Sequence, residues 1–264
     1  MSKKLIGLTG PSGFTPECID LLEEFYEADF VMLYHNNTDN LIRWVESCDG
    51  VCLAGGVDIH PMVYGDSIRN NRGFSKFDLK RDLREIKIID RCKETKKPLL
   101  GICRGHQLIG VTFGFHLIPD LAGSSVCHQS SLPQITLQQN EPMHSVSLVD
   151  PDEYFDVFPN CDADERSRFN GISCHEQNTK LWTNSFHHQG LAYPAAKEHW
   201  PAAAEAVKVY GTARVDLSDI NVDEIIELMG GDHWVACQWH PECDWRQNTA
   251  SGAVLGRFKT LLNQ

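Results

Sequence analysis

The chain has 264 residues, 42% of them hydrophobic and 23% charged, which are ordinary proportions for a soluble globular protein, and we expect one domain over residues 1–264. Its apolar runs are too short to span a membrane, and the first one breaks at residues 9–12, too early for a secretory signal, so we expect a cytoplasmic protein without a membrane partner. The formal net charge of −12 argues against nucleic acid as a partner, because phosphate binding needs clustered Lys and Arg.

Short apolar runs alternate with helical patterns in the first part of the chain. Residues 5–9 are apolar and end at a Gly/Pro/Ser turn, which predicts a buried first strand. A helix is expected over residues 16–26, a strand over 30–34, a helix over 41–47 and a strand over 50–54. This order is the start of a βαβ arrangement.

The same alternation returns later in the chain. An amphipathic helix is expected over residues 79–93, a strand over 98–102, a late strand over 234–239 and a closing helix over 252–262. We therefore predict an α/β fold: a three-layer, doubly wound and mostly parallel sheet, with helices on both faces. Functional sites of such folds lie at the carboxyl ends of the strands.

The middle of the chain, residues 124–181, has a different character. Polar and apolar residues alternate over 134–137 and 146–148, and Pro and Asp turns are frequent. We expect small antiparallel excursions and loops in this region, with little helix.

Cys103 follows an apolar strand directly and precedes a helical pattern. Gly101 and Gly105 flank it, which is the spacing of a nucleophile elbow, a tight strand-to-helix turn that needs neighbours without side chains. At a helix N-terminus the thiolate is favoured, and the backbone N–H of Arg104 can hold a developing oxyanion. The alternative is a buried structural cysteine, but the two glycines favour the elbow.

His240 and Glu242 follow the late strand and supply a base and a group to orient it. Residues two apart on an extended segment share a face, and Pro241 biases His240 toward extended geometry, so Glu242 is expected to reach the imidazole. Alone, this tripeptide would fit a structural His and a surface Glu better than a catalytic pair. Together with the elbow it predicts a Cys103–His240–Glu242 triad.

Gly55 and Gly56 form a second glycine turn after a strand and can bring another oxyanion N–H to the site, although a plain structural turn is the alternative. The role of the nearby Asp58 stays open. Ten cysteines without a CxxC pair indicate reduced core thiols. No zinc-type spacing of His and Cys is present, and the neighbours His187 and His188 are expected to point apart on a strand, so no metal is predicted.

Three separated segments, 101–107, 184–189 and 238–242, together resemble the class I glutamine amidotransferase-like superfamily. The glycine segment 55–65 and residues 81–85 are similar to its γ-glutamyl-γ-aminobutyrate hydrolase branch. The resemblance covers nearly the whole chain. It departs from the usual family pattern at Val57, Gly110 and residues 114–115, so the leaving amine is not carried over.

The resemblance implies a flavodoxin-like fold, the triad named above and an oxyanion hole near Gly56 and Arg104. It also implies a cysteine-dependent amidase that forms a glutamyl thioester, without a cofactor, on a small γ-glutamyl substrate; a homodimer is possible. Residues implied to bind the γ-glutamyl group are Gly55, Gln107, His188 and Gln189.

Three functions remain open on the sequence. The first is a free-standing hydrolase of γ-glutamyl amides, favoured by the lack of a synthetase domain in this sequence. The second is a glutaminase subunit that delivers ammonia to a separate synthetase. The third is a catalytically silent binding or regulatory protein on the same scaffold, against which the complete triad argues.

Overall fold

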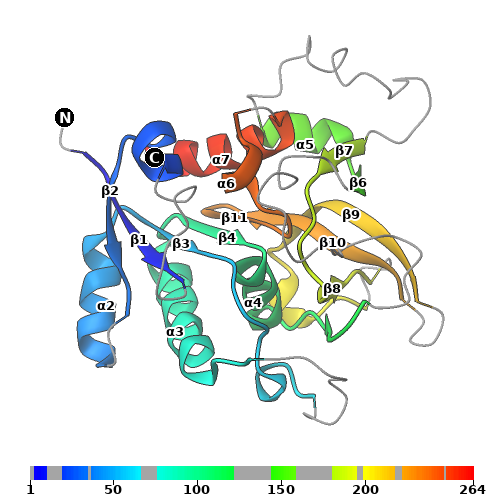
Figure 1. The fold of residues 1–264 in the computed structure, drawn as a ribbon, viewed down its shortest axis with the longest axis horizontal. Helices are drawn as coiled ribbons and strands as arrows, with labels where there is room; N and C mark the ends of the chain where they lie inside the picture. Colours follow the sequence, from blue (N-terminus) through cyan, green and yellow to red (C-terminus); the bar gives the residue numbers. More distant parts are fainter. Residues whose placement is uncertain are drawn as a thin grey trace.

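The computed structural model shows a large sheet enclosed by helices (Figure 1). It describes residues 3–10, 20–34, 37–66, 76–121, 144–158, 180–194, 199–217, 222–246 and 248–264. In this part of the chain no helix is long and apolar enough to cross a membrane.

Five parallel strands form the half of the sheet that carries the predicted elbow. Their spatial order is β2 (Asp29–Met32), β1 (Leu5–Thr9), β3 (Gly50–Leu53), β4 (Leu99–Ile102) and β11 (Trp234–Cys237). This is the strand order of flavodoxin-like folds, in which ligands bind outside the carboxyl ends of the strands. The predicted fold class is confirmed.

Helices cover both faces of these strands (Figure 1). One face packs against α2 (Thr38–Ser47), α3 (Leu79–Thr95) and α4 (Arg104–Thr112). The other packs against the π-helix η1 (Leu21–Phe25) and the C-terminal helix α7 (Thr249–Leu262). The result is the three-layer arrangement expected from the alternation of elements.

The strands alternate between the two cores because successive side chains of a strand point to opposite faces. On β4, Leu99 belongs to the core under α3 and α4, whereas Leu100 and Ile102 belong to the core under α7. On β11, Ala236 belongs to the core under α3 and α4, and Val235 belongs to the core under α7. Both faces are buried, which explains why these strands read as continuous apolar runs.

The sheet continues beyond β11 as an antiparallel half. It consists of β10 (Val222–Gly231), β9 (Lys208–Leu217), β6 (His144–Leu148) and β7 (Lys180–Thr183), in that order. A short pair, β5 (Leu117–Ile118) and β8 (Gly190–Ala192), attaches to β10. The β9–β10 pair was not predicted from the sequence, so the antiparallel part is larger than expected.

The middle region is only partly as expected. The strand predicted at 146–148 lies within β6, whereas 134–137 lies outside the described residues. The described part of this region also contains one short helix, α5 (Pro151–Val157), which forms from local start signals rather than from a long apolar pattern. Asp150 accepts a hydrogen bond from the Glu153 N–H, and proline occupies the first helical position.

The ends of several elements also differ from the sequence prediction. α7 begins at Thr249, three residues before its predicted start, because the Asn248 side chain caps it. The first part of the helix predicted at 16–26 lies outside the described residues, and η1 forms its remainder. In the part of the chain that the structure describes, short 3-10 helices form at η2 (Pro61–Val63) and η6 (Ala202–Ala204).

A buried network of four charges joins α3 to α4. The guanidinium group of Arg104 donates to both Asp82 and Glu85, and Arg81 Nε donates to Glu85 at 2.7 Å. All four side chains are 3% exposed or less, so each charge depends on these partners in place of water.

The network also fixes the turn after β3. Arg81 donates to the carbonyls of Ala54 at 2.9 Å and Gly55 at 3.1 Å. Asp82 accepts from the His60 N–H at 3.0 Å, a little further along the same loop. The glycine turn therefore cannot move without leaving a buried charge without its partner.

We predict that Glu85→Gln lowers the free energy of unfolding by about 3 kcal/mol or more, because it removes the carboxylate that pairs with the buried Arg81 and leaves the buried Arg104 with Asp82 alone. The matched control is Glu153→Gln, which breaks an ion pair with Lys208 whose side chains are 53% and 38% exposed. That variant is expected to lose less than about 1 kcal/mol. Urea denaturation of both variants measures the difference, and equal losses would contradict the role given to the buried network.

Candidate active site

Cys103 lies in the turn between β4 and α4, directly before the first residue of that helix. Its φ of 50° and ψ of −104° belong to a region that residues with side chains rarely adopt. The Cys103 N–H donates to the Cys237 carbonyl at 2.9 Å, and the Cys103 carbonyl accepts from the Gln107 N–H at 3.1 Å. The turn is therefore held by β11 on one side and by α4 on the other.

The two glycines that flank Cys103 are required by close packing. A Cβ atom on Gly105 would lie 2.2 Å from the Leu53 carbonyl oxygen of β3. One on Gly101 would lie 2.7 Å from Ile109 Cδ1 on α4 and 3.0 Å from the Gly105 backbone. The Gly-x-Cys-x-Gly spacing thus lets α4 begin against the ends of β3 and β4, as a nucleophile elbow requires.

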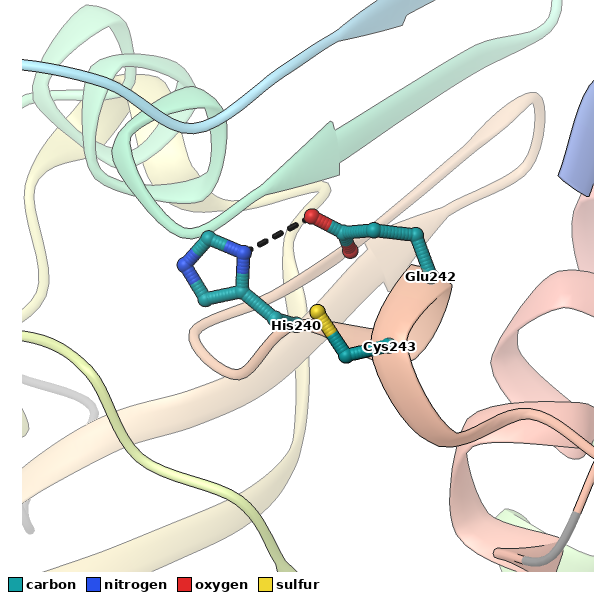
Figure 2. Close-up of side chains that lie close together, drawn as sticks. All are labelled: His240, Glu242 and Cys243. Atoms are coloured by element: carbon teal, nitrogen blue, oxygen red, sulfur yellow. Dashed lines mark hydrogen bonds and ion pairs between the residues drawn. The ribbon is translucent and has the colours of Figure 1, made fainter. Parts of the chain in front are cut away.

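His240 and Glu242 form a hydrogen bond of 2.7 Å between Nδ1 and Oε1, shown as the dashed line in Figure 2. The prediction that both residues lie on one extended segment is wrong. His240 is the residue before the short helix α6 (Pro241–Asp244), and Glu242 reaches back to the ring from the first turn of that helix. Pro241 suits the first helical position, where a backbone N–H has no partner within the helix.

Asn184 holds the backbone of His240 in place. Its Oδ1 accepts from the His240 N–H at 2.8 Å, and its Nδ2 donates to the His240 carbonyl at 2.9 Å and to Asp244 at 3.0 Å. The Asn184 side chain is fully buried. The role of Asn184 could not be predicted, because nothing in the local sequence reveals which distant backbone a buried amide will bond.

The imidazole of His240 lies between Glu242 and Cys103. Burial lowers the pKa of His240, but the charges of Glu242 and Cys103 and hydrogen bonds to both raise it well above its ordinary value of 6.5. The ring of Phe186 also packs edge-on against it, with centroids 5.8 Å apart. This environment favours a protonated imidazole, which can pair with a thiolate.

Cys243 lies beside the same two residues (Figure 2). Each of His240, Glu242 and Cys243 offers one atom that could bind a metal, and these three atoms lie within 4.8 Å of one another. The hydrogen bond between His240 and Glu242 explains their closeness without an ion, and a metal between them would have to displace it. The expectation that the protein uses no metal stays a prediction.

The glycine turn after β3 borders both Cys103 and the imidazole of His240. A Cβ atom on Gly55 would lie 2.8 Å from His240 Cε1 and 3.6 Å from Cys103 Cβ. Gly56 has a φ of 155°, and a Cβ atom there would lie 2.1 Å from Arg81 Nη1. The two predicted oxyanion donors therefore lie on elements that flank Cys103: Gly56 on this turn, and Arg104 as the first residue of α4.

Gln107 and Gln189, both implied to bind substrate, are buried behind the elbow, with 4% and 1% of their surface exposed. Gln107 Nε2 donates to the Gln189 backbone carbonyl at 3.0 Å and to Gln238 Oε1 at 3.1 Å. Gln189 Nε2 donates to the Pro119 carbonyl at 3.4 Å. The N–H groups of both side chains thus already have partners within the protein.

His188 lies in the segment between β7 and β8. Its Nε2 is 2.9 Å from Asp58, on the loop after the glycine turn, and its Nδ1 is 3.7 Å from Asp120. The hydrogen bond to Asp58 raises the pKa of His188 most; burial opposes this, and the charges of both carboxylates add to it. His187 points elsewhere: its Nδ1 is 2.8 Å from the Gln189 carbonyl, and its Nε2 is 3.6 Å from Glu227. The two rings point apart, as expected, but they lie on a bend rather than on a strand.

A cavity of about 560 Å³ opens at the opposite end of α4, between the residues after that helix and the β8–β10 region. Its lining includes Phe115, His116, Tyr193 and Glu224 but none of the residues predicted for catalysis or substrate binding. The Cys103–His240–Glu242 group and this cavity are therefore separate places on the molecule.

Comparison with known proteins shows the family of the chain. The family model "Peptidase C26" matches residues 17–242. The putative glutamine amidotransferase-like protein YvdE of Lactococcus lactis is 29% identical over 217 residues, covering 81% of this chain and 75% of the relative. The γ-glutamyl-γ-aminobutyrate hydrolase PuuD of Escherichia coli is 26% identical over 220 residues, covering 80% of this chain and 71% of that enzyme.

Among solved structures, a putative GMP synthase subunit from Thermoplasma acidophilum superimposes with a TM-score of 0.56 at 15% identity, covering 100% of this chain and 96% of that one. This likeness concerns the fold alone. The family match and the relatives identify an amidase-type enzyme. The chain belongs to the Peptidase C26 family, within the class I glutamine amidotransferase-like superfamily.

Proposed function

We propose that the protein hydrolyses γ-glutamyl amides through a thioester on Cys103, with His240 as the base and Glu242 as the residue that orients it. The observation that carries the proposal is the 2.7 Å hydrogen bond between His240 and Glu242, beside the glycine turn that also borders Cys103. Relatives named as γ-glutamyl hydrolases support the substrate class.

In the proposed first step, the Cys103 sulfur attacks the γ-carbonyl carbon and forms a carbon–sulfur bond. The N–H groups of Gly56 and Arg104 stabilise the oxyanion, and protonated His240 donates its proton to the leaving amine as the carbon–nitrogen bond breaks. His240 then deprotonates a water molecule, which attacks the thioester carbonyl. The resulting tetrahedral intermediate collapses and releases glutamate and the thiolate. Glu242 keeps the Nε2 side of the ring available for these transfers by holding Nδ1.

We assign recognition of the glutamyl end to the group formed by Asp58, His188 and Asp120. Asp58 lies on the loop that continues from Gly55, 2.9 Å from His188 Nε2. His188 is followed by Gln189, whose backbone carbonyl accepts from Gln107 on α4. With His188 protonated, the group carries one net negative charge, which complements an α-ammonium group, while the imidazolium can meet an α-carboxylate.

A glutaminase that supplies ammonia to a separate synthetase is the second candidate. It is favoured by the fold similarity to the putative GMP synthase subunit of Thermoplasma acidophilum, which extends over nearly the whole of both chains. A silent binding protein is disfavoured, because His240 keeps both its orienting carboxylate and its contact with Cys103.

We predict that Cys103→Ala abolishes turnover of γ-glutamyl amides and leaves the circular dichroism spectrum unchanged, because it removes the nucleophile and keeps Cβ. Cys243→Ala is the matched control, since it removes a partly buried thiol beside the same imidazole. It should retain activity within about threefold of the wild type. Residual turnover by Cys103→Ala would refute the mechanism.

We predict that the stability advantage of the wild type over Glu242→Gln decreases as the pH rises. The folded-state pKa of His240 lies well above 6.5, so proton binding to His240 stabilises the fold fully below the unfolded pKa and progressively less as pH rises through the folded pKa. Urea denaturation at about pH 6 and about pH 9 measures this. A pH-independent difference would show that Glu242 does not hold a charged imidazole.

We predict that the isolated protein hydrolyses γ-glutamyl derivatives of amines faster than it hydrolyses glutamine, since a hydrolase must accept a substituted amide nitrogen. Ammonia release from glutamine and amine release from a panel of γ-glutamyl amides, compared as kcat/KM, provide the test. Preference for glutamine by about tenfold or more would favour the glutaminase.

A further inference from the structure

A chain of three glutamine residues leads to the sulfur of Cys103. Gln107 Nε2 donates to the Gln189 backbone carbonyl at 3.0 Å and to Gln238 Oε1 at 3.1 Å. Gln238 Nε2 in turn lies 3.7 Å from Cys103 Sγ, a hydrogen-bonding distance for sulfur. Gln238 is fully buried, so no water competes for its amide.

The backbone carbonyl of Gln189 fixes the direction of this chain. A carbonyl can only accept, so the side chain of Gln107 must turn its NH₂ group toward it. The same NH₂ group faces Gln238, which must therefore present its oxygen to Gln107. The NH₂ group of Gln238 is then left facing the sulfur. Reversing either amide would bring two donors or two acceptors together.

We propose that Gln238 is a further catalytic residue, whose side-chain N–H stabilises the thiolate of Cys103, and that Gln107 is the positioning residue that orients it. This inference rests on the proposed function, because it concerns the same sulfur. It gives Gln107 a task beside the substrate recognition implied by the family resemblance.

A donor at this point acts on both halves of the reaction. In the free enzyme, it favours the charged sulfur that attacks the amide, because a buried hydrogen bond to a charged atom is stronger than one to a neutral atom. In the thioester the sulfur is neutral and accepts weakly. When water attacks, negative charge returns to the departing sulfur, and the Gln238 N–H is already in place to stabilise it.

The test is the pH dependence of the rate at which iodoacetamide alkylates Cys103, followed on the Cys103 peptide by mass spectrometry. This rate reports the reactivity of the sulfur without any substrate. In Gln238→Met, which keeps the volume but has no donor, we expect the midpoint to rise by about one pH unit. We expect a smaller rise in Gln107→Met, because the Gln238 amide is then no longer held in one orientation. The kcat/KM of Gln238→Met should approach that of the wild type at alkaline pH.

Ser251→Ala is the matched control. It removes the buried hydrogen bond to Trp239 Nε1, at the residue next to Gln238, on the side of the sheet that faces α7. We expect this variant to lose stability while the alkylation midpoint stays unchanged. An unchanged midpoint in folded Gln238→Met, or an equal shift in Ser251→Ala, would overturn the proposal.

If Gln238→Met does not fold, Gln107→Met carries the test, and an unchanged midpoint there would overturn the proposed orientation of Gln238. A failure of this proposal can be distinguished from a failure of the proposed function. Retained turnover by Cys103→Ala would refute that function, whereas the alkylation midpoints report on the Gln238 contact alone.

Discussion

Four charged side chains, nearly without contact to water, determine where the parts of the candidate site lie. Arg81, Asp82 and Glu85 stand on α3, and Arg104 is the first residue of α4. Each charge is stable there only with its partners, because an unpaired ion in the interior is strongly destabilising. Since Arg81 also binds the carbonyl of Gly55, the start of α4 and the glycine turn are fixed relative to each other, with Cys103 between them.

The parallel half of the sheet could be predicted from the sequence because each of its strands is a short apolar run that ends in a turn. The β9–β10 pair could not be predicted, because its sequence shows neither the continuous apolar run of a fully buried strand nor the regular alternation of a half-buried one. β10 is buried along most of its length, yet Glu227 interrupts its apolar run, and β9 includes Arg214 and a glycine. Pairing in this half is decided by contacts between strands, which a single segment does not reveal.

The local parts of the candidate site could also be predicted, since glycine spacing and the order of His240 and Glu242 are visible within a few residues. Its supporting parts could not. Asn184 binds the backbone of His240 across 56 positions, and the Gln238 amide contacts Cys103 across 135. Arg104 was singled out for its backbone N–H, whereas its side chain belongs to the buried network. Long-range hydrogen bonds of this kind follow from the fold and have no local signature.

The backbone conformation at position 103 favours one direction of mutation, from cysteine to glycine. A side chain at its positive φ retains strain of about 1–3 kcal/mol, whereas glycine adopts such a conformation freely and gives back only about 0.5–1 kcal/mol through chain entropy. Losing the sulfur to glycine would therefore relax the turn. On this scaffold, the loss of the catalytic side chain relieves backbone strain, so selection must act on the chemistry itself to keep the thiol.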